Sequence, residues 1–151
     1  YEHVPVPPGG KPQAEERMLE LLDGNVDLVV LARYMQILSA EFLERIGVPL
    51  VNIHHSFLPA FAGPDPHREA YEKGVKIIGA TAHYVVEELD AGPIIEQDVA
   101  RVSHRESIAD LTRLGEEIER SVLARAVALH LEDRTLVYEN KTIVFQGRSF
   151  G

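Results

Sequence analysis

Two short, unbroken apolar runs constrain the fold of this chain more than any other feature. They occupy residues 28–32 (LVVLA) and 50–53 (LVNI), and each is too short for a buried helix. Runs of this length, rich in leucine and β-branched residues, are typical of strands covered on both faces. Between them, a helical pattern over residues 39–46 ends at Gly47 and Pro49. Two buried strands joined by a helix predict a Rossmann-like α/β fold with a mostly parallel sheet.

Further elements are predicted after and before this unit. Ser107 and Asp110 form a capping signature at the start of a long amphipathic helix. Residues 54–66 hold three prolines and a glycine, which predicts a loop at the end of a buried strand, where ligands bind in open α/β sheets. The other predicted elements are a helix over residues 13–23, a short helix over 67–73, strands over 77–86 and 94–102, and a small C-terminal hairpin over 136–145.

Composition excludes several classes of function. The chain has 24 acidic and 15 basic residues, a formal net charge of −9 and no run of Lys or Arg, so no nucleic-acid partner is expected. It has no cysteine, which rules out a disulfide framework, a thiolate zinc site and a cysteine nucleophile. No apolar stretch approaches the ~20 residues of a membrane-spanning helix, so we expect no membrane partner and a cytoplasmic location. The 151 residues fit one domain, residues 1–151.

Asn52 and His54 lie at the end of the second predicted strand, separated by one residue. Because side chains alternate along a strand, both point to the same side. An amide donor beside an imidazole can stabilise a developing oxyanion and move a proton at a carbonyl centre. The alternative is a structural role, in which Asn52 closes a turn and His54 bonds backbone groups. The short motif by itself favours that alternative.

Asp90 lies in a predicted turn (LDAGP), where an aspartate commonly bonds its own backbone. The preceding strand, however, carries Thr81 and His83 at alternate positions, which gives an otherwise apolar strand one polar face. Polar groups on a buried face need partners. If this face meets Asn52 and His54, we expect Asp90 to pair with the charged form of His54 or to act as a base toward water.

The histidines also allow a metal site. Imidazole and carboxylate are good ligands for zinc or iron. The spacing here, one adjacent pair followed by long gaps, matches no compact ligand signature, so a metal-dependent hydrolase is kept only as the alternative chemistry. Its candidate ligands are His54, His55, His67, His83, His104 and Asp90.

Three longer stretches carry a resemblance to a known family. They are NIHHSFLPAF from Asn52, GATAHYV from Gly79 and LDAGPIIEQ from Leu89. With the rest of the chain, they resemble the formyltetrahydrofolate deformylases. The wider formyltransferase family, which includes glycinamide ribonucleotide formyltransferase and methionyl-tRNA formyltransferase, shares the Asn-x-His and Asp-x-Gly-Pro elements. The HHSF sequence and the stretch ARYMQ (residues 32–36) resemble the deformylase branch in particular.

The resemblance implies a formyltransferase-type fold and hydrolysis of 10-formyltetrahydrofolate to formate and tetrahydrofolate. It implies that Asn52, His54 and Asp90 are the catalytic residues, and that the folate is the substrate of a reaction needing no metal or other cofactor. We also expect a homo-oligomer. The expected substrate-binding residues are Leu31, Met35, Gln36, Ile37, Leu38, His83, Val86, Glu87, Glu88 and Leu89.

Two other functions stay open: a transferase passing the formyl group to an amine acceptor, and a folate-binding module without turnover. The resemblance implies that the chain is the C-terminal part of a longer one, because family members begin this domain with a strand, a helix and a strand ahead of the position of Tyr1. Deformylases carry a regulatory ACT-type domain before that. Residues 63–68 (GPDPHR) depart from the family pattern, with a basic residue lost and a histidine shifted, which leaves the contacts of this loop open.

Overall fold

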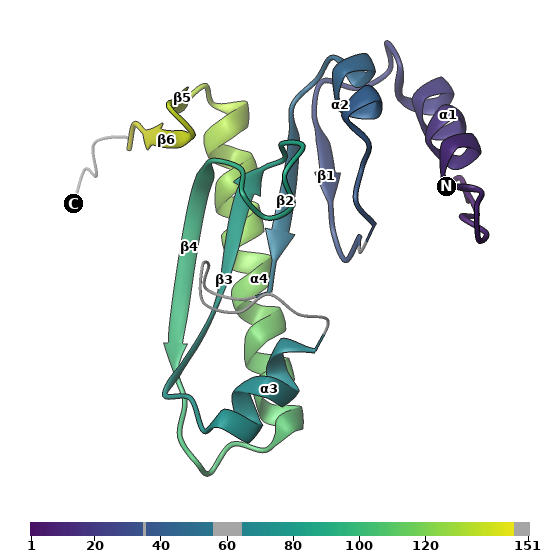
Figure 1. The fold of residues 1–151 in the computed structure, drawn as a ribbon. Coiled ribbons are helices and arrows are strands. Elements are labelled where there is room, and N and C mark those ends of the chain that lie inside the picture. The colour runs from purple at the N-terminus through teal and green to yellow at the C-terminus, as the bar shows by residue number, and fades with distance from the viewer. Residues whose placement is uncertain (35, 56–64, 147–151) are drawn as a thin grey trace.

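The computed structural model describes residues 1–34, 36–55 and 65–146, which form an α/β fold (Figure 1). In chain order the elements are α1 (Lys11–Leu22), β1 (Val29–Leu31), α2 (Ala40–Ile46), β2 (Leu50–His54), α3 (Pro66–Lys73), β3 (Ile77–Tyr84), β4 (Ile94–Arg101), α4 (Ile108–Leu131), β5 (Thr135–Tyr138) and β6 (Lys141–Val144). Four strands make one sheet in the order β1-β2-β3-β4, and β5 and β6 form a separate antiparallel pair. The predicted α/β class and C-terminal hairpin are confirmed.

The sheet is mixed in its strand directions. β1 and β2 are parallel, as the predicted βα unit requires, whereas β3 runs antiparallel to both of its neighbours, β2 and β4. The short turn containing Asp90 joins β3 directly to β4, and a connection of this kind allows only antiparallel pairing. Within the described residues, the parallel part of the sheet is therefore its β1–β2 side. Most of the loop predicted over residues 54–66 lies outside the described residues.

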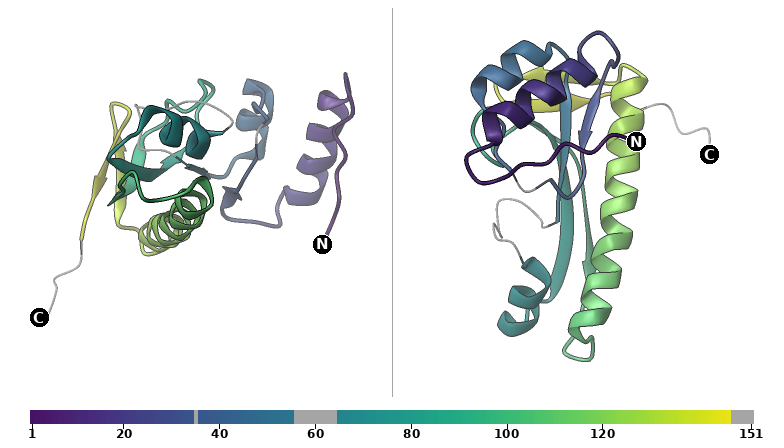
Figure 2. Two further views of the ribbon diagram at one scale, coloured as in Figure 1. Left: turned by 90° about the horizontal axis from the view of Figure 1, so that it is seen from below. Right: turned by 90° about the vertical axis from the view of Figure 1, so that its right-hand side faces the viewer.

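Helix α4 covers one face of the sheet (Figure 2). Its start is fixed by Ser107, whose hydroxyl accepts from the backbone N–H of Asp110 at 3.1 Å, while the Asp110 carboxylate accepts from the Ser107 N–H at 2.9 Å. The predicted capping signature is thus confirmed as a capping box. The core between helix and sheet consists of Val51, Ile53, Ala80, Ala82, Ile95, Val122 and Ala126.

A second core holds α1 and α2 at the β1 side of the sheet (Figure 1). Leu19 of α1 and Phe42 of α2 are buried there. Glu15 of α1 is also buried, and its carboxylate accepts from both the backbone N–H and the hydroxyl of Ser39, the N-cap of α2. Residues 36–38 immediately precede Ser39, so this contact fixes where that segment lies.

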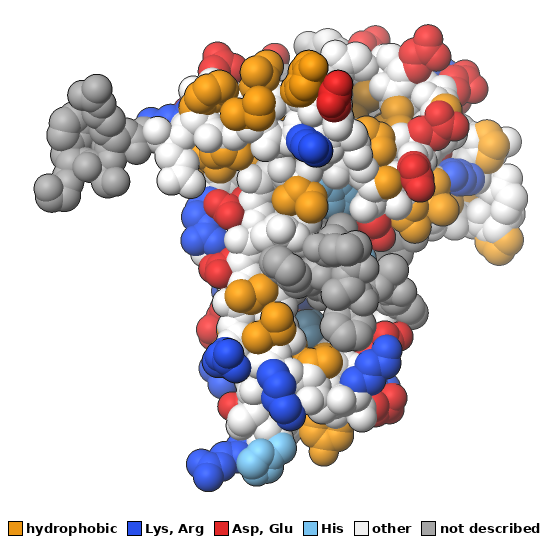
Figure 3. Space-filling model, turned by 60° about the vertical axis from the view of Figure 1, so that its left-hand side comes forward, with side chains coloured by type: hydrophobic (Ala, Val, Ile, Leu, Met, Phe, Trp, Pro, Cys, Tyr) orange, Lys and Arg blue, Asp and Glu red, His pale blue; other side chains and the backbone are white. Residues whose placement is uncertain are grey.

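Exposed apolar side chains gather on the C-terminal hairpin (Figure 3). They include Leu136, Val137, Tyr138 and Ile143, each at least 46% exposed. In the part of the chain that the structure describes, no helix combines the length and the apolar character needed to cross a membrane.

Candidate active site

Antiparallel pairing of β2 with β3 brings the predicted polar side chains together. Asn52 lies directly opposite His83, and His54 lies opposite Thr81. The alternate residues of both strands pack against α4, so these four side chains share the other face of the sheet. The structure therefore confirms that the polar face of β3 meets Asn52 and His54.

A hydrogen-bond chain orients Asn52 through His83. His83 is 2% exposed, and its Nδ1 lies 2.9 Å from the carbonyl oxygen of Tyr84. Because a carbonyl oxygen only accepts, Nδ1 donates to it, and Nε2 of the neutral ring is an acceptor. The amide nitrogen of Asn52, 3.4 Å from Nε2, donates to it. The amide keeps a second N–H with which it can donate to a substrate oxygen.

Asp90 completes the cluster from the turn after β3. Its Oδ1 lies 3.5 Å from Nδ1 of His54 and 3.7 Å from Nε2 of His83. The side chains of His54 and Asp90 are only 11% and 18% exposed, so charges on them are poorly screened by solvent. These distances exceed those of ordinary hydrogen bonds, and catalytic contacts are often long before substrate is bound. The three residues predicted to be catalytic thus lie within reach of one small group.

The backbone around Gly92 holds the Asp90 turn against β3. Asp90 has a φ of 54°, a left-handed conformation that aspartate tolerates better than most residues. A Cβ at Gly92 would lie 1.6 Å from the carbonyl oxygen of Tyr84, so only glycine fits there. The Tyr84 N–H also donates to the Pro93 oxygen at 3.0 Å. Since the same Tyr84 carbonyl orients His83, this close approach sets two parts of the cluster at once.

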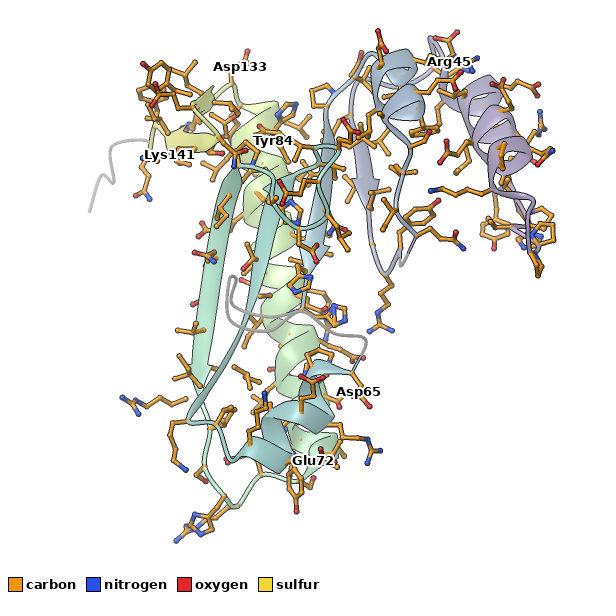
Figure 4. The ribbon with its side chains drawn as sticks, viewed as in Figure 1. Arg45, Asp65, Glu72, Tyr84, Asp133 and Lys141 are labelled. Atoms are coloured by element: carbon orange, nitrogen blue, oxygen red, sulfur yellow. The ribbon has the colours of Figure 1, made fainter. Side chains whose placement is uncertain are left out.

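The C-terminal hairpin supports the same turn. The side-chain amide of Asn140, between β5 and β6, donates to the carbonyl oxygen of Ala91 at 2.9 Å. At the end of β3, the Tyr84 hydroxyl lies 2.7 Å from Nδ1 of His130 and 2.7 Å from Oγ1 of Thr135 (Figure 4). The hairpin is therefore tied both to the Asp90 turn and to the strand before it.

A cleft of about 420 Å³ opens beside this cluster, and Asn52, His83 and Asp90 contribute to its lining. The structure places every predicted substrate-binding residue in this lining except Met35, which lies outside the described residues. Tyr34 and Val85 also line the cleft. Neither residue was among the predicted substrate-binding residues, although each adjoins a predicted segment. Burial and the nearby Glu15 carboxylate raise the pKa of the Tyr34 phenol, which keeps it a neutral hydrogen-bonding group.

A second hollow, of about 680 Å³, lies beside His55 at the end of β2. Nδ1 of His55 is 3.8 Å from Oε1 of Glu119 on α4, and its ring centroid is 5.6 Å from that of His54 and 6.5 Å from that of His67. Burial lowers the pKa values of His55 and His67 and raises that of Glu119. Sequence reasoning considered His55 and His67 only as candidate metal ligands and missed Glu119, which no local pattern connects with them.

The candidate metal ligands are only partly brought together. His54, His55 and His67 are neighbours, but His104 lines a different hollow together with Lys76. Within residues 1–34, 36–55 and 65–146, no three His, Asp or Glu side chains are arranged to hold a metal ion.

Comparison with known proteins places this site in a family. A family model described as formyl transferase matches residues 10–127. The chain belongs to the formyl transferase family. It is 63% identical over 145 residues to the formyltetrahydrofolate deformylase of Mycobacterium tuberculosis (strain H37Rv), covering 96% of this chain and 47% of that protein. It is 60% identical over 134 residues to the same-named protein of Bacillus subtilis, covering 88% and 45%. The chain thus spans about half the length of the curated relatives it matches.

Solved structures of formyl transferase family members have the same fold. A formyltetrahydrofolate deformylase from Pseudomonas syringae matches with a TM-score of 0.90 and 55% identity, over 97% of this chain and 49% of that chain. A glycinamide ribonucleotide transformylase from Symbiobacterium toebii matches with a TM-score of 0.79 and 32% identity, over 94% and 66%. The predicted formyltransferase-type fold is confirmed, as is the resemblance to the deformylase branch.

Proposed function

We propose that this protein hydrolyses 10-formyltetrahydrofolate to formate and tetrahydrofolate. The reaction would supply these two products to one-carbon and purine metabolism. The cluster of Asn52, His54 and Asp90 beside a cleft supports the proposal most directly. The relatives described above, and others down to 47% identity, are named for this activity. Because the chain spans half of their length, the activity is proposed for the whole protein to which this domain belongs.

The three residues have distinct roles in the proposed reaction. Asp90 orients a water molecule and takes its proton as the water oxygen attacks the formyl carbon. Asn52 and protonated His54 donate hydrogen bonds to the oxyanion that forms. The C–N bond then breaks, His54 passes its proton to the departing N10, and formate and tetrahydrofolate leave. In the chemical step itself His83 acts indirectly, because it fixes the direction of the Asn52 amide.

The cleft is proposed to hold the folate. Residues 36–38 and 85–89 form two of its walls, and backbone groups of these segments are proposed to bond the pterin edge. The apolar contacts with the folate are assigned to Leu31, Ile37, Leu38, Val86 and Leu89. The polar contacts are assigned to Gln36, His83, Glu87 and Glu88. Met35 is assigned to the cleft from the sequence. The reaction is proposed to need no cofactor, in a cytoplasmic protein that forms homo-oligomers and has no nucleic-acid or membrane partner.

A formyltransferase is the second candidate, since the transformylase structure shares the fold. The two activities differ in the acceptor. We expect formate release from 10-formyltetrahydrofolate in water alone, with no increase in substrate consumption when candidate amines are added. Substrate consumption that requires an amine would establish the transferase instead, and folate binding with no turnover would establish a binding module.

Loss of activity on prolonged chelation, restored by zinc or iron, would support the metal-dependent alternative.

Asn140→Gly should lower the rate of formate release about two- to fivefold, because the loss of one hydrogen bond loosens the Asp90 turn. Asn140 has a φ of 58°, which glycine adopts freely, so the change removes the bond to Ala91 and leaves the hairpin turn intact. Kinetics at saturating substrate measure the effect. Asn25→Ala is the control, since it removes a similar exposed bond, 3.1 Å to the Leu21 oxygen, far from the site. Equal rates in Asn140→Gly and the unsubstituted protein would contradict a bracing role.

A further inference from the structure

We propose that Glu119 is a positioning residue for His54 and that it acts on His54 through His55. The inference rests on the hydrolysis proposed above, in which His54 is the proton donor. Oε1 of Glu119 lies 3.8 Å from Nδ1 of His55, and the His55 ring lies 5.6 Å from the His54 ring, tilted by 43°. On its other side, His54 faces Asp90 at 3.5 Å. The His54 ring is thus held between Asp90 and a His55–Glu119 pair.

The sheet separates Glu119 from the cleft. His54 is the last residue of β2, His55 follows it directly, and their rings lie 5.6 Å apart. His54 shares the cleft face with Asn52, whereas His55 lies on the face covered by α4, where Glu119 is. Glu119 is absent from the lining of the cleft. His55 is the side chain that contacts both Glu119 and His54, although the charge of His54 also lowers the pKa of Glu119.

The side chains of His55 and Glu119 are sheltered from solvent, so the charge of Glu119 is effective over the distance to His54. The side chains of His55 and Glu119 are 21% and 16% exposed. Burial, the charge of His54 and the charge of Arg33 lower the pKa of His55, so His55 gives up its proton readily. Burial raises the pKa of Glu119. An ionised Glu119 then stabilises positive charge on His54 across the neutral His55 ring.

Other charged groups, of both signs, surround the pair. The groups that face it are Arg33 after β1, His54 on β2, Asp65 and His67 at the start of α3, Asp90 after β3, and Glu116 on α4. Arg33 lies 2.7 Å from Glu116, and Asp65 is paired with Arg68 at the exposed start of α3 (Figure 4). The pKa of His67 is lowered by burial and by His55, which favours its neutral form. Glu119 is thus the anion nearest to His55.

Because the pKa of Glu119 is raised, its effect on His54 should depend on pH. At acid pH the Glu119 carboxyl is neutral and resembles the amide of a glutamine. As pH rises through its pKa, the carboxyl becomes ionised, and only then does the unsubstituted protein differ from Glu119→Gln. A side chain that served only to pack α4 against β2 would instead give the same loss at every pH.

The test is a pH profile of kcat and KM for Glu119→Gln. We expect kcat about three- to tenfold below that of the unsubstituted protein at neutral and alkaline pH, with the two converging toward acid pH, and KM unchanged. Glu119→Asp, which keeps the charge, should restore most of kcat and also serves if the glutamine variant is unstable. Glu117→Gln is the control, because Glu117 is 54% exposed on α4 and pairs with Arg113. A loss of equal size at all pH values, or a change in KM alone, would overturn the proposal.

A double-mutant cycle tests the route through His55. In a His55→Gln background, Glu119→Gln should cause no further loss of kcat, because the connecting ring is already gone. Additive losses would show that Glu119 acts by another path and would overturn the proposal.

A measurement independent of turnover separates this proposal from the proposed function. In an NMR titration, the His55 ring signal, identified by its loss in His55→Gln, should titrate at lower pH in Glu119→Gln than in the unsubstituted protein, and should be unaffected in Glu117→Gln. If the unsubstituted protein releases no formate, the proposed function fails, and the titration alone then decides whether Glu119 acts on His55. An unchanged His55 titration in Glu119→Gln would overturn the inference in either case.

Discussion

Asp90→Asn should abolish formate release, with kcat reduced about 10³-fold, the size of effect expected when a general base is lost. The amide has nearly the same shape as the carboxyl group, but it can neither take a proton from water nor pair with a charged His54. Asparagine also tolerates the φ of 54° at this position, so the turn itself is preserved. Steady-state kinetics of formate release measure the effect, and folate binding measured by calorimetry should change little.

Asp133→Asn provides the matched control for this change. Asp133 has a φ of 55° and lies in an exposed turn after α4, so the same substitution is made in the same backbone conformation away from the cleft. Its activity should equal that of the unsubstituted protein. Full activity in Asp90→Asn would remove the carboxylate from the mechanism and with it the proposed hydrolysis.

The local parts of the site were predictable because they follow from the geometry of single elements. Alternation along a strand was enough to place Asn52 and His54 on one side, and Thr81 and His83 on one side of another strand. The capping signature of Ser107 and Asp110 was enough to predict where α4 begins. Each of these patterns depends on residues within four positions of one another, so tertiary packing has little opportunity to change it.

The parts that depend on strand register were not predictable from the patterns alone. Asn52 meets His83 because β2 and β3 pair antiparallel in one register, and a shift of one residue would have turned the polar face toward α4. The pairing of His55 with Glu119 depends in addition on how α4 lies across the sheet. The likeness to a known family supplied the Asn52, His54 and Asp90 cluster from sequence, but it drew no attention to Glu119.

The observed boundaries of helices and strands differed from the predicted ones where a residue was compatible with two structures. The first helix begins at Lys11, two residues before the predicted start, because Pro12 fits the first turn, where its missing N–H is not needed. Strand β3 ends at Tyr84 rather than at Val86, and residues 85–89 instead form a wall of the cleft. The apolar character of Val85 and Val86 suits a strand and a ligand-binding wall equally well.

Gly92→Ala should reduce kcat about 100-fold, because a displacement of about 1 Å in a catalytic group costs this much. The added Cβ would lie 1.6 Å from the Tyr84 carbonyl oxygen and 3.2 Å from Nδ1 of His83. The nearer neighbour is backbone, which cannot rotate away, so the turn must move and take Asp90 away from His54. The carbonyl that orients His83 is disturbed by the same clash. Overpacking of this kind should also lower the free energy of unfolding by about 1–3 kcal/mol, measured by denaturant titration.

Gly24→Ala separates the loss of stability from the loss of positioning. Gly24 follows α1 with a φ of 69°, and a Cβ there would meet nothing within 4 Å. The strained backbone should cost about 1–2 kcal/mol of stability, comparable to Gly92→Ala, while kcat stays unchanged. If Gly92→Ala lost stability but kept its kcat, the close approach of the turn to Tyr84 would be a feature of folding alone. A selective loss of kcat would instead mean that one glycine, by allowing two backbone segments to touch, sets the distance between Asp90 and His54.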